Sequence, residues 1–213
     1  MPVLTKLQIE SRLEAARLLI DNAIADTEIQ NSLTTMGFTL AQLQAGQTLL
    51  SAAVQAVAHQ DEVAGRKASA TVAQGEAAEA LRVAYQGCVD RARLVGVAAL
   101  LTSLGIVGST PKALAGLILA AEKFLHTVSD SPSVAAALAT RGVDAARLAG
   151  LQSTLTILKT AESAQEKAKG DSQSATQAQN DALAALQAFV GPLKRGARIA
   201  CKGREDLLTK LGL

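Results

Sequence analysis

Apolar residues recur at helical spacing along this chain, and residues that start or stop helices separate them into segments. Between residues 5 and 24 they recur every three or four positions, which predicts an amphipathic helix that begins at a capping box formed by Thr5 and Gln8. A short helix is predicted after Asp26, a preferred N-cap residue, and Gly37 suits the left-handed conformation that follows a helix end. Few positions alternate with the period typical of a half-buried strand, so the pattern predicts an all-α protein.

A second capping box, Thr39 with Gln42, predicts the start of a longer helix, and Phe38 and Leu43 occupy the hydrophobic-staple positions around it. We interpret Gly65 as the end of this helix. Its packing seam is predicted to consist of Leu43, Gln47, Leu50, Val54 and Val57. The helix after Gly65 is expected to pack closely along Ala70, Ala73, Ala77, Ala80 and Ala84.

A nearly all-apolar segment from Val89 to about Leu104 is predicted as a further helix that ends at Gly105. The same order of signals then returns 105 residues later. The matched starts, ends and breaks are Thr5-Lys6 with Thr110-Pro111, Asp26-Thr27 with Ser131-Pro132, Gly37 with Gly142, Gly65 with Gly170, Gly87 with Pro192, and, after a two-residue insertion, Leu100–Ile106 with Leu207–Leu213.

The recurrence predicts a tandem duplication of a helical-bundle unit of about 105 residues, with four main helices and one short helix in each copy. The expected domains are residues 1–106 and 107–213, packed against each other with pseudo-symmetry. Composition agrees with closely packed helices, because 49% of the residues are hydrophobic, only 2% are aromatic, and Ala and Leu dominate.

Charge and cysteine content restrict the classes of partner and compartment. A net charge of +2 gives no long-range field that would attract nucleic acid or anionic lipid. Cys88 and Cys201 do not occupy matching positions of the two copies, so we interpret them as free, buried thiols in a reducing cytosol. The N-terminus lacks a basic stretch followed by an apolar run, which indicates no secretory signal and favours a cytoplasmic location.

The polar residues that the two copies share are the candidates for ligand or partner binding. They are Gln47 and Gln152, Thr71 and Thr176, Gln74 and Gln179, and Arg93 and Arg198. A structural interpretation stands beside this one: a buried glutamine fixes helix register, a threonine binds a backbone carbonyl, and an arginine ties off a helix end.

No pattern in the sequence predicts a catalytic site, a metal site or a cofactor. His59 and His126 do not match each other and lack the spacing of a di-iron bundle motif. Cys88 has no orienting base in its neighbourhood, which favours a structural thiol.

Two segments depart from the general composition. Residues 94–108 carry no charge, and we interpret this segment as buried between the copies, because its counterpart near the C-terminus is polar. Between residues 159 and 181 no apolar side chain is larger than Ala, which predicts the solvent-exposed tip of a projecting helical hairpin. Such a hairpin could serve as a partner-binding arm. A basic cluster is interpreted as a solvated face rather than a nucleic-acid site, and it consists of Lys194, Arg195, Arg198, Lys202 and Arg204.

The Leu-Leu-Thr-Xaa-Leu-Gly-(Ile/Leu) endings at 100–106 and 207–213, with the Gly-(Phe/Val)-(Thr/Asp) entries at 37–39 and 142–144, resemble uncharacterised bacterial helical-repeat proteins. The resemblance covers the whole chain and implies no activity.

We therefore expect a non-enzymatic interaction or structural protein of the bacterial cytoplasm, with a protein partner of unknown identity. One alternative is a small-molecule binding protein whose pocket lies at the interface between the copies, lined by Gln47, Gln152, Arg93 and Arg198. A third hypothesis is membrane association through residues 94–125.

Overall fold

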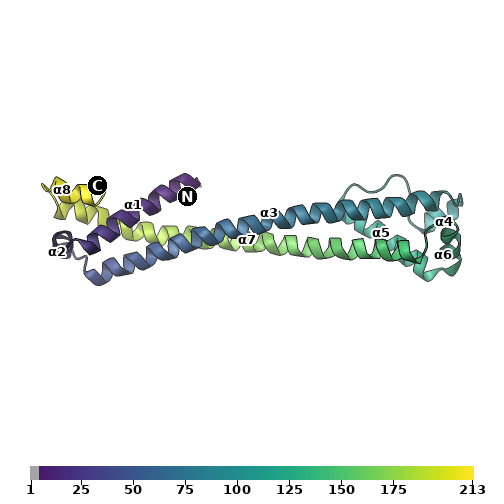
Figure 1. The fold of residues 1–213 in the computed structure, drawn as a ribbon, viewed down its shortest axis with the longest axis horizontal. Helices are drawn as coiled ribbons and strands as arrows, with labels where there is room; N and C mark the ends of the chain where they lie inside the picture. Colours follow the sequence, from purple (N-terminus) through teal and green to yellow (C-terminus); the bar gives the residue numbers. More distant parts are fainter. Residues whose placement is uncertain (1–4) are drawn as a thin grey trace. The chain divides into compact units, whose positions relative to one another are not determined.

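The computed structural model describes residues 5–213 and, within them, consists of helices and contains no strand (Figure 1). The all-α prediction is therefore confirmed for this part of the chain. Residues 1–4, part of the N-terminus in which we see no secretory signal, lie outside the described residues. The helices are α1 (Lys6–Ala25), α2 (Thr27–Thr35), α3 (Leu40–Arg93), α4 (Ala98–Ser103), α5 (Leu114–Asp130), α6 (Pro132–Ala139), α7 (Ala145–Ala200) and α8 (Glu205–Lys210).

The chain forms two compact units, and each unit draws on both halves of the sequence. Unit 1 combines residues 1–64 with 171–213, and unit 2 comprises residues 65–170. Unit 1 therefore holds α1, α2, the first half of α3, the second half of α7, and α8. Unit 2 holds the other halves of α3 and α7 together with α4, α5 and α6. These units divide the chain differently from the predicted domains 1–106 and 107–213.

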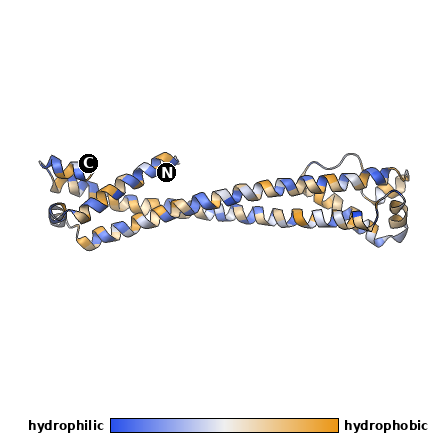
Figure 2. Cartoon of the chain, viewed as in Figure 1, coloured by the Kyte–Doolittle hydropathy of each residue, from blue (hydrophilic) through white to orange (hydrophobic). Residues whose placement is uncertain are grey.

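The expected break at Gly65 is wrong, because α3 continues through it for 54 residues and α7 continues through Gly170 for 56. A glycine inside a helix costs about 1 kcal/mol relative to alanine, but it keeps its N–H, so the hydrogen-bond ladder stays intact among the good helix formers that flank it. Residues 159–181 are consequently the middle of α7 and not the tip of a hairpin. Figure 2 shows polar and apolar residues interspersed along both long helices.

Pro192 also lies inside α7, where we expected a disruption. A proline in a helix interior removes one ladder hydrogen bond and costs about 3 kcal/mol. The helix continues because Val190 precedes the proline, Leu193 and Ala197 follow it, and all three are buried in the core of unit 1. Tertiary packing therefore outweighs the local penalty.

The short-range helix signals are mostly confirmed. Thr5 and Gln8 form the reciprocal capping box, and Asp26 accepts hydrogen bonds from two backbone amides at the start of α2. Thr39 and Gln42 make the same exchange at the start of α3. Gly37 has a φ of +85°, the left-handed conformation expected after a helix end.

Two predicted boundaries are wrong. Thr110-Pro111 does not start a helix, because α5 begins at Leu114 and the carbonyls of Pro111 and Lys112 instead accept hydrogen bonds from Arg82. The segment 89–104 is not one helix, because α3 ends at Arg93 and α4 begins at Ala98. Gly96 lies between them with a φ of +75°, which an uninterrupted α-helix does not allow.

The core of unit 1 lies between α1, the start of α3 and the end of α7. Within α3 the buried positions include Gly46 and Ala53, whereas the predicted seam members Gln47 and Val54 are exposed. The reason is size: the Phe189 ring packs so closely on Gly46 that a β-carbon there would clash with it. The predicted seam members Leu43 and Leu50 are buried as expected, and the small residues Gly46 and Ala53 take the places predicted for Gln47 and Val54.

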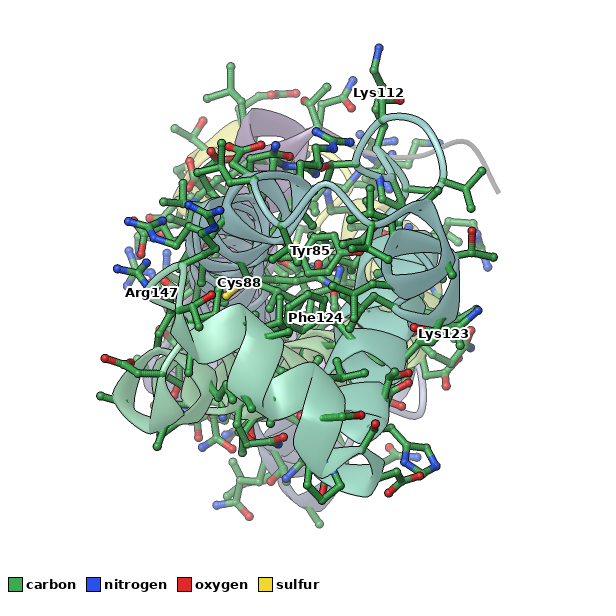
Figure 3. The ribbon with its side chains drawn as sticks, turned by 90° about the vertical axis from the view of Figure 1, so that its right-hand side faces the viewer. Tyr85, Cys88, Lys112, Lys123, Phe124 and Arg147 are labelled. Atoms are coloured by element: carbon green, nitrogen blue, oxygen red, sulfur yellow. The ribbon has the colours of Figure 1, made fainter. Side chains whose placement is uncertain are left out.

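The core of unit 2 is built around α5. The rings of Tyr85 and Phe124 meet edge to face with centroids 6.1 Å apart, in the interior of this unit (Figure 3). Leu151 and Ala84 belong to this core and lie 105 positions from Gly46 and Phe189 respectively. In both units the smaller residue of these pairs, Gly46 or Ala84, lies on α3, and the larger one, Phe189 or Leu151, lies on α7.

The alanine seam predicted along the second half of α3 is confirmed only in part. Ala77 is buried, whereas Ala73 and Ala80 are exposed. The buried stripe continues instead through the larger Leu81, Tyr85 and Cys88 and then through Ala92.

Because Gly46 and the Phe189 ring are in close contact, we predict that the effect of Gly46→Ala on the free energy of unfolding changes sign when Phe189 is replaced by alanine. Gly46→Ala should gain about 1 kcal/mol in helix propensity, but displacement of the Phe189 ring should make the net effect a destabilisation of about 1–2 kcal/mol. In a Phe189→Ala background the same substitution should stabilise by about 1 kcal/mol, because the clash is gone. Urea unfolding of the four proteins measures both effects.

Gly75→Ala is the matched control, because a β-carbon at Gly75 meets open space. It should stabilise the protein in both backgrounds. A stabilising Gly46→Ala in the presence of Phe189 would show that the close approach does not constrain the core.

Polar contacts between α2 and α8 close the end of unit 1. Lys210 binds Asp26 at 2.7 Å, Arg204 binds both Glu28 and Asp206, and the amide of Asn22 donates to the Lys210 carbonyl at 2.5 Å. The hydrogen bond from Lys210, together with the backbone amide of Ile29, lowers the pKa of the Asp26 carboxyl. Asp26 is therefore both the cap of α2 and the partner of α8.

Because the pKa of Asp26 is lower in the folded state, its contribution is present above the unfolded value of 3.8 and is lost as the pH falls through the folded value. We expect the melting temperature to drop below about pH 4, and Asp26→Asn, which keeps a capping oxygen, to make that drop shallower. Thermal unfolding between pH 7 and pH 2 measures the effect. Asp171→Asn, at an exposed position, is the control that should follow the wild-type curve. Equal curves for all three proteins would contradict the prediction.

Candidate functional site

The eight candidate polar residues are divided between the two compact units. Gln47, Thr176, Gln179 and Arg198 belong to unit 1, and the remaining four, Thr71, Gln74, Arg93 and Gln152, belong to unit 2. The predicted pocket of Gln47, Gln152, Arg93 and Arg198 thus takes two residues from each unit.

Gln47 and Gln152 are exposed, so neither is the buried, register-fixing residue that we expected. Gln47 donates to Asp21 at 3.3 Å, and Gln152 donates to Thr156 at 3.5 Å, one turn along α7. The reason is the shift of the seam by one residue, which turns both amides toward solvent. The buried glutamines of the described chain are instead Gln165 and Gln179.

The threonine pair follows the structural interpretation. The hydroxyl of Thr71 donates to the Lys67 carbonyl at 2.9 Å, and that of Thr176 donates to the Ser172 carbonyl at 2.8 Å. Both bonds run back four residues within the same helix, which is the usual way a threonine satisfies its hydroxyl in a helix interior.

Arg93 fastens the loop that follows α4. Its guanidinium donates to the Gly108 carbonyl at 2.7 Å and lies 3.6 Å from Asp90. Arg198 is exposed in the last turn of α7, where a cation interacts favourably with the helix dipole. Gln74 is half-buried on α3.

The uncharged segment 94–108 is largely exposed, which corrects our expectation that it is buried between the copies. Leu94 is 66% exposed, Val97 51% and Val107 78%, and α4 has no buried residue. We call the exposed residues with side chains in this segment, together with Ser109 after it, the apolar face: Leu94, Val97, Ala98, Ala99, Thr102, Ser103, Val107 and Ser109. The core of unit 2 takes up only the inner side of the segment, through Leu100, Leu101 and Leu104.

The corresponding surface of unit 1 is charged. With the two-residue insertion, Val97, Ala98 and Ala99 correspond to Arg204, Glu205 and Asp206. Arg204 binds Glu28 and Asp206 there, and Lys210 binds Asp26. Figure 2 accordingly colours α4 toward the hydrophobic end of the scale, while hydrophilic residues appear in α8. The surface that carries ion pairs in unit 1 therefore carries exposed apolar side chains without charge at the corresponding positions of unit 2.

A groove of about 680 Å³ lies between α5 and α7 in unit 2 and includes Gln152. Glu122 and Lys159 form an ion pair of 2.5 Å across it, and Leu119 is 66% exposed beside them. The groove is also lined by Lys123 and His126 and by the apolar Leu125 and Leu155, so it combines apolar and polar side chains.

Cys88 and Cys201 are both buried and unbonded, as we expected for the pair. Burial raises the pKa of the Cys88 thiol, against the opposing effect of Arg147 and Arg91 (Figure 3). Burial likewise raises the pKa of Cys201. Both thiols therefore stay protonated at neutral pH, whereas a nucleophilic cysteine needs its thiolate.

This burial predicts that Ellman's reagent will leave both thiols unmodified in the native protein and will titrate both in urea. An exposed reference thiol, Ser51→Cys, should react promptly under native conditions. Fast native-state reaction at Cys88 or Cys201, assigned with single Cys→Ala variants, would show that the thiol is accessible and activated.

Comparison with known proteins gives no match: no protein-family model, no curated protein and no solved structure is similar to this chain. Within residues 5–213, no group of His, Cys, Asp and Glu side chains is arranged to hold a metal ion. None of the helices in this range is both long and apolar enough to cross a lipid bilayer.

Proposed function

We propose that this chain is a non-enzymatic helical interaction protein that binds the apolar side of a partner helix with the apolar face of unit 2. The observation that carries the proposal is the contrast at α4 and α8. Corresponding positions hold an ion-paired, charged surface in unit 1 and an exposed surface without any charge in unit 2. Exposed apolar surface lowers solubility and is retained where another molecule covers it.

The shape of the apolar face suits a helix. Ala98 and Ala99 are small and exposed on α4, and the larger Leu94 and Val97 lie next to them in the chain. Small residues let a second helix approach closely, and flanking aliphatic side chains provide the contact area. The segment itself offers no cation to an anionic lipid headgroup or to nucleic acid.

A tandem duplication is part of the proposal, because it makes the comparison of the units meaningful. The helices of the first half recur in the same order in the second half, at a nearly constant offset in residue number: α1, α2, α3 and α4 correspond to α5, α6, α7 and α8. Left-handed glycines recur as Gly37 with Gly142, Gly96 with Gly203, and Gly105 with Gly212.

Packing recurs as well. A β-carbon on Gly105 would meet Lys123, and one on Gly212 would meet Leu18, the residue 105 positions before Lys123. Recurrent backbone conformation and recurrent neighbours support duplication of a structural unit, with pseudo-symmetry between the copies. We place the protein in the bacterial cytoplasm as part of the same proposal.

Photo-crosslinking tests the proposed face. Benzoylphenylalanine at Ala98 should form an adduct of defined mass with one protein species in the native host. The same residue at Glu205, the corresponding position of α8, should form none. Ala99→Asp, which gives α4 the residue that α8 has at that position, should abolish the adduct at residue 98 while the helical circular dichroism stays unchanged.

Equal labelling at residues 98 and 205 would overturn the assignment of the face. Adducts only with lipid would replace it by membrane association, the hypothesis that involves residues 94–125. Adducts only with a second copy of this chain would replace the partner helix by self-association.

A further inference from the structure

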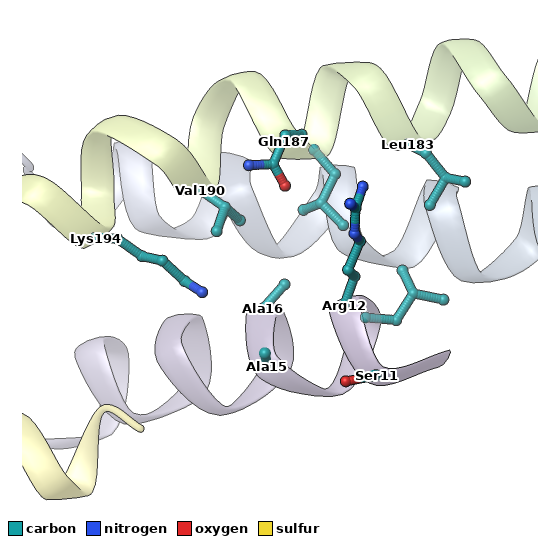
Figure 4. A pocket seen from close by; sticks show the side chains of 10 residues that line it. Ser11, Arg12, Ala15, Ala16, Leu183, Gln187, Val190 and Lys194 are labelled. Atoms are coloured by element: carbon teal, nitrogen blue, oxygen red, sulfur yellow. The ribbon is translucent and has the colours of Figure 1, made fainter. Parts of the chain in front are cut away.

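A small pocket opens between α1 and the second half of α7, entirely within unit 1 (Figure 4). Its volume is about 150 Å³. The apolar part of its lining consists of Leu13, Ala15 and Ala16 from α1 and Leu183, Leu186 and Val190 from α7. Since α1 and α7 come from the two halves of the sequence, the pocket lies between the copies, although none of its residues is among our eight candidates.

Two cations lie in the lining of this pocket. Lys194 reaches from α7 toward α1, and Arg12 reaches from α1 toward α7 (Figure 4). Within the described residues neither side chain forms an ion pair with a carboxylate. Ser11 and Gln187 add a hydroxyl and an amide to the same lining. The pocket thus combines an apolar floor with positive charge that no protein group neutralises.

The corresponding place in unit 2 has different residues: Arg82 lies 105 positions before Gln187, and Tyr85 and Val89 line a smaller pocket of about 40 Å³ together with Arg93. The buried stripe of α5 is Leu117, Ala121, Phe124 and Val128, and the residues 105 positions earlier are Arg12, Ala16, Leu19 and Ala23. Arg12 therefore takes the position of the fully buried Leu117. In the same way Lys194 corresponds to the buried Val89, and Val190 to the larger Tyr85, whose ring packs on Phe124.

The covering of the two places differs as well. In unit 2 the loop before α5 lies over this region: Pro111 contacts the position of Gly116, and Arg82 holds the Pro111 and Lys112 carbonyls. The corresponding residues of unit 1 are the first turn of α1, which begins at Lys6. Arg12 is exposed and Lys194 half-buried, whereas Leu117 and Val89, at the corresponding positions of unit 2, are buried and apolar.

We propose that this pocket binds a small amphipathic anion, with an oxyanion headgroup at Arg12 and Lys194 and an apolar body of about six carbons on the floor. The size follows from the volume, because an apolar cavity of about 150 Å³ accommodates a benzene molecule. A guanidinium binds carboxylate and phosphate oxygens through paired N–H groups, and an ammonium adds a mobile point charge. The proposal does not depend on the apolar face of unit 2.

Titration of the full-length protein by calorimetry and NMR tests the site with defined probes. Hexanoate and hexyl phosphate supply the two possible headgroups on the same body, and 1-hexanol and hexylamine supply a neutral and a cationic counterpart. At least one anion should bind with amide shifts confined to α1 and the end of α7, and hexanol and hexylamine should bind about tenfold more weakly or not at all.

Variants that carry the corresponding residues of unit 2 distinguish binding at this pocket from non-specific association of the anion with the protein. Arg12→Leu with Lys194→Val installs the residues found at Leu117 and Val89, so the protein should remain folded while anion binding weakens at least about tenfold. Arg12→Lys should retain part of the affinity. Arg195→Ala, which removes an exposed neighbouring cation outside the pocket, should leave it unchanged.

The proposal is overturned if hexanol binds as tightly as the anions, if the double variant binds as well as the wild type, or if neither anion binds at millimolar concentration. A preference for hexyl phosphate over hexanoate would assign the headgroup as phosphate, and the opposite preference would assign it as carboxylate.

Discussion

The structure depends on the continuity of the helical hydrogen-bond ladder through Gly65 in α3 and Gly170 in α7. Because α3 does not turn back at Gly65, residues 66–93 cannot cover the apolar side of residues 40–64. That side, with Leu43, Leu50 and Ala53, is covered instead by the last turns of α7. Because both helices continue, each compact unit is completed by residues from the other half of the sequence, and neither half of the chain contains a whole core.

Within this common frame the two units solve the same packing problem with different residues. In unit 1 the close approach of the long helices depends on a small residue of α3, Gly46, against a large one of α7, Phe189. In unit 2 the smaller Ala84 is again on α3 and the larger Leu151 on α7, and both belong to the core. The outer surfaces of the units differ as well, since α8 carries paired charges and α4 carries none.

Local signals were predictable because they are decided within one or two turns. The capping boxes of Thr5 and Thr39 and the left-handed Gly37 depend on neighbours in sequence alone. Whether a helix ends at Gly65 or Pro192 was not predictable in this way, because it depends on whether packing against residues distant in sequence stabilises the continued helix. The seam of α3 was predicted correctly at Leu43 and Leu50 and was one residue off at Gln47 and Val54, because the Phe189 ring packs on the small Gly46.

The candidate site shows where a repeat helps and where it misleads. Several of the residues that recur at the 105-position offset make structural contacts, such as the threonines that bind their own helix and the arginine that fastens a loop. If the chain is the tandem duplication that we propose, a structural role needed in each unit recurs in both, whereas a binding role needed once occurs in only one. The signal that was present in the sequence is therefore a mismatch: Arg12 against Leu117, and Lys194 against Val89. Arg12 is exposed and Lys194 half-buried, whereas their counterparts are buried and apolar, so unit 1 gives up apolar contact at these two positions and presents positive charge there, which the anion that we propose would use.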